Sequence, residues 1–183
     1  MRWLQLCLVL LLVPLAACSL NSVSSYPAEQ RGPYTLDAGD AIAVSVYGDD
    51  SFTKTYRVDD SGTVGLPLVG PVVVRGLTVN QAAGKIAAAL AHGFMRNPNV
   101  TVQVDTYRPF FIQGAVKNGG QFPYVPGMTV RAAISTAGGF ADTASQGRVT
   151  IYRRQGDQNF KANVDLDFPI YPGDTIVVPE RWL

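Results

Sequence analysis

Short segments in which hydrophobic and polar residues alternate, or hydrophobic residues run together, predict β-strands from Tyr34 onwards. In the first half of the chain, strands are expected at residues 41–47, 55–58 and 100–104, with a further strand region at 63–74. Glycine and proline break this last region into short pieces, at Gly62, Gly65, Pro67, Gly70 and Pro71. In segment 100–104 valine alternates with threonine and glutamine, which predicts a strand with one face in water.

From Thr78 the spacing of the hydrophobic residues changes to that of an amphipathic helix. Its hydrophobic face consists of Val79, Ala82, Ala83, Ile86, Ala87 and Leu90. Thr78 and Gln81 have the spacing of a capping box, and Gly93 is expected to cap the other end. His92, the one histidine of the chain, falls at this second end, where a capping or solvated role is expected.

The second half repeats the order of strands and helix. A strand at 110–116, a hairpin turn at 117–120 and a returning strand at 121–125 are expected first. A short helix capped by Thr129 follows, with Val130, Ala133, Ile134 and Ala137 at helical spacing and Gly138-Gly139 after it. The remaining strands are expected at residues 148–154, 160–166 and 175–178.

Strands that curl round one helix in each half predict an α+β fold with two small modules, at residues 34–106 and 107–183. One internal similarity links the two modules: residues 36–44 resemble residues 170–178, and each segment has a Gly-Asp pair before a strand. In both, glycine permits a turn with positive φ, and aspartate can bond the backbone beyond it. Two independent β-turns explain this similarity, and it indicates no ligand.

The N-terminal segment predicts export and lipidation. Arg2 precedes an apolar run that ends in Ala16-Ala17-Cys18, the layout of a lipoprotein signal peptide at residues 1–17. The run is shorter than the roughly 20 apolar residues of a spanning helix. Cys18 is then the lipidated N-terminus, and Ser19 after it matches the sorting rule for the outer membrane, with the protein facing the periplasm. Residues 18–33 are rich in Ser, Pro and Gly and predict a flexible tether.

Composition excludes some partners. Of 15 Lys and Arg residues, loss of Arg2 with the signal leaves 14 against 14 Asp and Glu, so the mature chain is neutral and nucleic acid is not an expected partner. Cys7 leaves with the signal and Cys18 is acylated, so no disulfide is expected. Each module of roughly 75 residues has a small core, worth about 3–5 kcal/mol, which favours association between copies.

Catalytic chemistry is not expected, and the protein is predicted not to be an enzyme. One histidine and no free cysteine argue against a metal site, and no cofactor motif is present. The carboxylate pairs Asp49-Asp50, Asp59-Asp60 and Asp165 with Asp167 are expected to be solvated turn residues. Arg153 and Arg154 are expected at a solvated strand edge, with subunit contacts as the alternative.

Aromatic residues are the remaining candidates for carbohydrate contact, although strand packing also explains them. They are Tyr107, Phe110, Phe111, Phe122, Tyr124, Tyr152, Phe168, Tyr171 and Trp182. Trp182 could also anchor in a membrane interface or a partner's pocket. The sequence does not select among them, so the ligand-binding residues stay open.

A family resemblance is carried by ordered motifs. In the first module these are Tyr34, Leu36, Gly39-Asp40, residues 62–70, Gly76-Leu77-Thr78, the Ala-rich helix ending at Leu90, Asn97-Pro98, Val100 and Val102. In the second they are residues 113–116, residues 120–122, the helix into Ala137-Gly138-Gly139, and Pro172-Gly173-Asp174. In this order they resemble the bacterial outer-membrane polysaccharide export family, with a polysaccharide export module followed by a soluble-ligand-binding β-grasp module.

The resemblance implies a homo-oligomeric ring that passes capsular or extracellular polysaccharide and works with an inner-membrane polysaccharide co-polymerase. The sequence has one β-grasp module and stops at Leu183, where better-known members continue into a pore helix. A separate outer-membrane β-barrel is therefore the expected exit. Two alternatives stay open: a periplasmic glycan-binding or tethering module without a conduit, and a glycan hydrolase that uses a carboxylate pair such as Asp59-Asp60.

Overall fold

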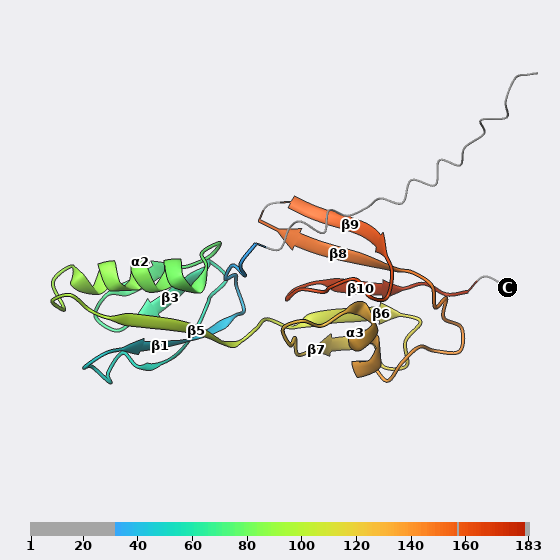
Figure 1. Cartoon of the computed structure of the whole chain (residues 1–183), viewed down its shortest axis with the longest axis horizontal. Helices are drawn as coiled ribbons and strands as arrows, with labels where there is room; N and C mark the ends of the chain where they lie inside the picture. The colour runs from blue at the N-terminus through green and yellow to red at the C-terminus, as the bar shows by residue number, and fades with distance from the viewer. Residues whose placement is uncertain (1–31, 157, 182–183) are drawn as a thin grey trace, which may run out of the picture.

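The computed structural model describes residues 32–156 and 158–181, which form two α+β modules with separate hydrophobic cores (Figure 1). The first core is built from residues between Leu36 and Val102, and the second from residues between Phe110 and Val178. The predicted α+β fold is confirmed.

The first module combines a sheet, a separate hairpin and a helix. Its elements are β1 (Ala41–Val46), β2 (Lys54–Arg57), β3 (Thr63–Leu66), β4 (Gly70–Val73), α2 (Val79–Ala91) and β5 (Val100–Thr106). The antiparallel sheet has the order β2-β1-β5, and β3 and β4 pair with each other. The glycines and prolines of residues 63–74 therefore produce a hairpin with a tight loop at 67–69.

Helix α2 packs its predicted hydrophobic face on the first core. Ala82, Ile86 and Leu90 are fully buried, and the helix contacts β5. The capping box forms as expected, because Thr78 Oγ1 accepts a hydrogen bond from the backbone N–H of Gln81 at 3.3 Å and Gln81 Oε1 accepts one from Thr78 at 2.9 Å. On β5 the valines face the helix and the polar residues between them are exposed, which confirms a strand with one wet face.

An apolar tip, formed by Tyr47, Leu68 and Phe94, ends the first module. Leu68 lies in the loop between β3 and β4, with φ +63° and a side chain that is 77% exposed. This backbone conformation costs a leucine about 1 kcal/mol. Tyr47 follows β1 and Phe94 follows α2, and both are exposed. The ends of these elements and the β3–β4 loop lie at the end of the module farthest from the second module (Figure 1).

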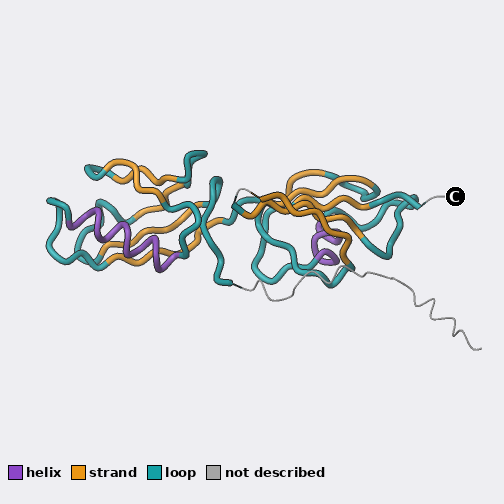
Figure 2. Tube along the Cα trace, turned by 90° about the horizontal axis from the view of Figure 1, so that it is seen from above, coloured by secondary structure: helices purple, strands orange, loops and turns teal. Residues whose placement is uncertain are grey.

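The second module is a five-stranded mixed sheet with one helix. Its elements are β6 (Phe110–Gly114), β7 (Gly120–Phe122), α3 (Val130–Thr136), β8 (Val149–Gln155), β9 (Gln158–Val164) and β10 (Thr175–Val178). The order is β7-β6-β10-β8-β9, with β10 parallel to β6 and the other pairs antiparallel. Helix α3 lies on one side of this sheet (Figure 2).

The first hairpin of the second module is shorter than expected. The strand predicted at 110–116 ends at Gly114, which has φ +92° and lies so close to the Val178 carbonyl that a side chain would collide with it. The returning strand predicted at 121–125 covers Gly120–Phe122, because Pro123 has no N–H to continue the ladder.

Two further observations bear on membrane association. The described helices are too short and too polar to cross a bilayer. The predicted signal peptide at 1–17 and the lipidated Cys18 lie outside the described residues.

Candidate functional site

The two Gly-Asp turns each bury an aspartate. Asp40 and Asp174 are fully buried, and they are the buried charged side chains of the described part of the chain. In each turn the aspartate Oδ2 accepts a hydrogen bond from the backbone N–H three residues earlier, that of Asp37 at 2.9 Å and that of Tyr171 at 2.7 Å. The glycines of the two turns have φ +94° and +86°, which glycine adopts without strain. The repeated sequence is therefore a repeated structure.

Arg108 satisfies the Asp40 carboxylate with both its backbone and its side chain. Its backbone N–H donates to Oδ1 at 2.9 Å, and its Nη1 donates to Oδ2 at 3.2 Å. The Tyr34 hydroxyl donates to the same Oδ2 at 2.6 Å and accepts from Arg108 Nη1 at 2.8 Å. Burial and the bond to Asp40 raise the pKa of Tyr34, so its hydroxyl keeps its proton. The three side chains form a closed triangle of hydrogen bonds.

Arg153 holds the second aspartate in the same way. Its Nε and Nη2 donate to the two carboxylate oxygens of Asp174 at 2.8 and 2.7 Å, a bidentate pair. Burial nevertheless raises the pKa of Asp174, and Arg153 opposes that effect. The guanidinium lies 4.2 Å from the centroid of the Tyr171 ring, as that of Arg108 lies 5.8 Å from the Tyr34 ring. The prediction of a solvated edge residue is wrong for Arg153, since the buried carboxylate of Asp174, in the turn before the neighbouring strand β10, requires a cation.

Arg108 also contacts the second turn. It lies in the three-residue connection between β5 and β6, and its side chain is 19% exposed. A Cβ atom at Gly173 would lie 2.9 Å from Arg108 Nε, and the Gly173 N–H donates to the Pro109 carbonyl at 3.0 Å. Arg108 therefore lies between the two turns and joins the modules. No local pattern marks this residue, because its carboxylate partner is 68 positions away; the Gly-Asp repeat points to the aspartate and not to its cation.

Asp37 extends the contact between the modules. Its carboxylate lies 3.0 Å from Arg75, 3.6 Å from Arg154 of β8 and 3.7 Å from Arg108. Burial acts to raise the pKa of Asp37, but the Ala38 N–H and the three guanidinium groups hold it below its ordinary value of 3.8. Asp37 is therefore ionised at neutral pH and attracts an arginine from each module.

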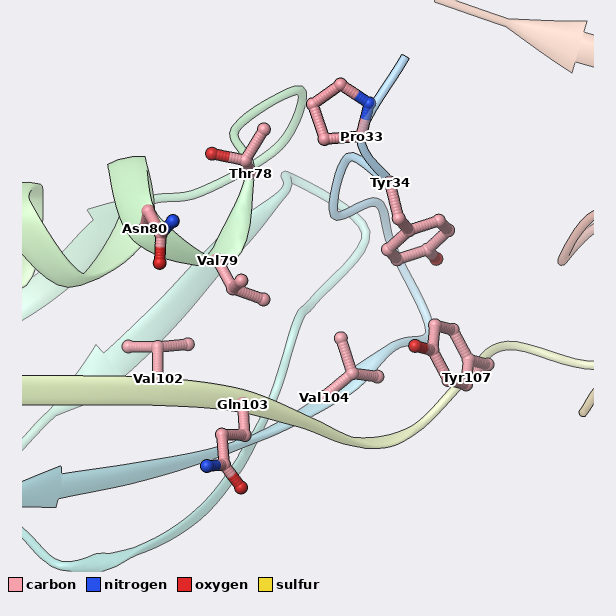
Figure 3. Close-up of a pocket in the computed structure, with 9 residues that line it drawn as sticks. All are labelled: Pro33, Tyr34, Thr78, Val79, Asn80, Val102, Gln103, Val104 and Tyr107. Atoms are coloured by element: carbon pink, nitrogen blue, oxygen red, sulfur yellow. The ribbon is translucent and has the colours of Figure 1, made fainter. Parts of the chain in front are cut away.

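An open groove of about 400 Å³ lies beside this junction (Figure 3). It is lined by Pro33, Tyr34, Thr78, Val79, Asn80, Val102, Gln103, Val104 and Tyr107. The Tyr107 ring stands edge-on to Tyr34 at a centroid distance of 5.0 Å and to Tyr124 at 5.5 Å. Because the lining has rings, amides and a hydroxyl but no charged side chain, the groove suits an uncharged polar group.

The structure separates the aromatic candidates for carbohydrate contact. Those in the second core or packed against it are Phe110, Phe122, Tyr124 and Phe168. Tyr107 lines the groove, and Tyr171 packs on Arg153. Phe111 and Tyr152 are exposed on the sheet of the second module. Trp182 lies outside the described residues.

The carboxylate pairs stabilise turns. Asp59 accepts hydrogen bonds from the backbone N–H and the hydroxyl of Thr63, and Asp49 accepts similar bonds from the residue two positions later. Asp165 accepts one from the backbone N–H of Asp167. These bonds hold the pKa values of Asp49 and Asp59 below 3.8, whereas the general acid of a glycosidase needs a raised pKa. His92 is exposed at the end of α2, where it was expected.

Comparison with known proteins assigns the two modules to known families. Residues 28–105 match the model of the polysaccharide biosynthesis/export proteins, and residues 109–161 match the SLBB domain. The exopolysaccharide production protein ExoF of Rhizobium meliloti (strain 1021) is 35% identical over 86 residues, covering 46% of this chain and 20% of that protein. The polysialic acid transport protein KpsD of Escherichia coli is 29% identical over 160 residues, covering 81% of this chain and 28% of that protein.

The two family models match in this order, on the modules that the fold defines. The chain belongs to the polysaccharide export protein family. It spans 20% and 28% of the length of the two relatives named above. The SLBB match ends at residue 161, so the second Gly-Asp turn and β10 lie beyond it, although β10 pairs with two of the strands inside it.

Proposed function

We propose that the protein is a non-enzymatic subunit of an oligomeric translocon that guides capsular or extracellular polysaccharide through the periplasm to the outer membrane. The observation that carries this proposal is the pair of family matches, in order, on one chain. The relatives' names, exopolysaccharide production and polysialic acid transport, support a sugar polymer as the cargo.

The junction supports a guiding role rather than a catalytic one. Arg108 and Asp37 bond across the boundary between the modules, so each subunit offers the polymer a wall of fixed shape. The outer face of the first sheet carries hydroxyl, amide and carboxylate groups, including Ser45, Thr101 and Gln103, which suit a hydrated chain. Energy for transport then comes from polymer synthesis, with an inner-membrane polysaccharide co-polymerase as the partner.

Association of copies is supported by the unpaired surfaces of both modules. In the described residues, β2 and β5 form the edges of the first sheet, and β7 and β9 those of the second. Such edges offer unpaired backbone groups to another chain. The apolar tip adds exposed hydrophobic surface at the end of the first module, so a ring of identical subunits would bury surface that one copy leaves in water.

Anchoring through Cys18 completes the proposal. Acylation at this position would hold the protein at the outer membrane, and residues 18–33 would let the two modules extend into the periplasm. The test is to delete the gene, weigh the surface polysaccharide, and complement with wild type, Cys18→Ala or Cys7→Ala. We expect Cys7→Ala to restore export, because Cys7 lies within the cleaved signal, and Cys18→Ala to fail.

Ring-shaped particles from purified lipidated protein are the expected second result. Normal export in the deletion strain, or a protein that stays monomeric at high concentration in detergent, would overturn the translocon. The monomeric result would instead favour a periplasmic glycan-binding or tethering module, a function that the groove with Tyr34 and Tyr107 also suits.

A further inference from the structure

One face of the second sheet carries two exposed aromatic rings in a single row across the strands. Thr175 of β10 pairs with Phe111 of β6 on one side and with Tyr152 of β8 on the other. Phe111 is 42% exposed and Tyr152 is 43% exposed. The residues that follow or precede them along the strands, such as Ile112 and Ile151, are buried in the core, so the rings point to the opposite side of the sheet.

Polar side chains surround the two rings. The register extends this row to Gln121 on β7 and Lys161 on β9, and the next row holds Gln113, Val177, Thr150 and Asn163. The open face, as we call it, consists of these two rows: Gln121, Phe111, Thr175, Tyr152 and Lys161 in the first, and Gln113, Val177, Thr150 and Asn163 in the second. Most of them carry an amide, a hydroxyl or an amine, so the surface offers hydrogen bonds between and beside the rings.

The open face also carries a cation, Lys161. The five strands of the second module contain Arg153, Arg154 and Lys161 and no aspartate or glutamate. Arg153 is turned to Asp174 and Arg154 pairs with Asp37 at 3.6 Å, whereas Lys161 is exposed, with its Nζ 5.5 Å from the centroid of the Tyr152 ring. A cation beside an exposed ring is suited to a ligand that has both an apolar face and a negative charge.

The surroundings leave this side of the sheet accessible. Figure 2 shows α3 on one side of the sheet only, and its buried residues Val130, Ala133 and Ile134 pack in the core on that side. On the other side, Phe111 and Tyr152 are exposed.

We propose that the open face binds an acidic polysaccharide chain. This inference rests on the proposed function and assigns the surface that contacts the polymer. The apolar faces of two sugars would stack on Phe111 and Tyr152, which are two strands and therefore about 10 Å apart, a span that fits alternate sugars of an extended chain. The amides bond the hydroxyl groups, and Lys161 attracts the sugar carboxylates.

Two other occupants are less consistent with this surface. Nucleic acid requires a cluster of cations along a backbone, and this face has Lys161 with Arg154 at its end. A second copy of the chain would find few apolar groups here beyond the rings and Val177, whereas the apolar tip of the first module offers a more hydrophobic contact.

The test uses polysaccharide purified from the surface of the bacterium that carries the gene, in its native form and after chemical reduction of its carboxyl groups. Binding to the protein without its lipid is measured by affinity electrophoresis and calorimetry. We expect the native polymer to bind, the carboxyl-reduced polymer to bind more weakly, and the double variant Phe111→Ala/Tyr152→Ala to lose about tenfold in affinity. Lys161→Gln should lower affinity for the native polymer only.

Matched controls separate binding from folding. The variant Val125→Ala removes exposed apolar surface of the second module outside the open face and should bind as wild type does. The exchange Phe111→Tyr/Tyr152→Phe keeps both rings and should retain binding. Thermal unfolding verifies that each variant folds.

Several outcomes would overturn the inference. They are no binding of the native polymer, equal binding of native and reduced polymer, unchanged affinity in Phe111→Ala/Tyr152→Ala, or a loss of self-association in that variant without a loss of polymer affinity. If gene deletion abolishes export while Phe111→Ala/Tyr152→Ala binds the polymer as wild type does, the open face is not the polymer-binding surface and the proposed function stands. If deletion leaves export normal, the proposed function fails independently of these binding data.

Discussion

Arg108 donates two hydrogen bonds to the Asp40 carboxylate, one from its backbone nitrogen at 2.9 Å and one from its guanidinium at 3.2 Å. The same guanidinium lies against Gly173, so one side chain contacts the repeated turn of each module. Arg108 therefore links the two modules, whose hydrophobic cores are separate.

Replacing Arg108 with alanine should lower the free energy of unfolding by about 3 kcal/mol, because the buried Asp40 carboxylate loses its cation. Urea denaturation measures the change. Arg75→Ala is the control: Arg75 pairs with Asp37 but its side chain is 45% exposed, so its loss should cost less than about 1 kcal/mol. Equal losses in the two variants would contradict the role assigned to Arg108.

Gly173→Ala should destabilise the protein more than Gly127→Ala. Both glycines have φ +86°, which costs an alanine about 1 kcal/mol. At Gly127 the added methyl group meets nothing within 4 Å, whereas at Gly173 it would lie 2.9 Å from Arg108 Nε. The excess should disappear in an Arg108→Ala background, and a double-mutant cycle by thermal unfolding checks this. An excess that persists without Arg108 would show that the clash lies elsewhere.

Asp37 should make stability depend on pH in the acid range. The pKa of Asp37 is lower in the folded protein than its ordinary value of 3.8, so its contribution is fully present above that value. It is lost as the pH falls through the lower, folded pKa. Unfolding by urea at several pH values should show this acid loss in the wild type and a smaller one in Asp37→Asn. Asp167→Asn, at an exposed surface pair, should behave as wild type does.

Leu68→Gly should weaken self-association without unfolding the protein. Glycine relieves the left-handed conformation at φ +63° but increases the freedom of the unfolded chain, so the free energy of unfolding should change by less than about 1 kcal/mol. Sedimentation velocity of the wild type, Leu68→Gly and the control Val125→Ser, which is exposed in the second module, measures association. If all three associate alike, the apolar tip is not a subunit contact.

Local patterns predicted most of the secondary structure. The helical spacing that ends at Leu90, the cap at Thr78 and the strand at 175–178 depend on neighbours in sequence, and the structure has all three. The expected strand at 121–125 was too long, because the pairing with β6 stops at Pro123. A single missing donor had more effect there than strand propensity.

Contacts between distant residues could not be predicted in the same way. The Gly-Asp repeat was visible, but nothing in it indicates that Arg108 and Arg153 neutralise the two aspartates, since these partners are 68 and 21 positions away. Exposure is also a property of the fold: Phe110 and Phe111 are neighbours in sequence, and only the pairing of β6 decides that the first is buried and the second is on the open face.

The central place of β10 determines when the second module can form. Because β10 is the bridge between β6 and β8, the strands of the second module before Thr175 pair only as the separate hairpins β6–β7 and β8–β9. An isolated hairpin is marginal in water. As the chain emerges during synthesis, the first module can close its sheet once Thr106 is free, whereas the second must wait for residues 175–178, and until then its apolar strands are exposed to chaperones and proteases.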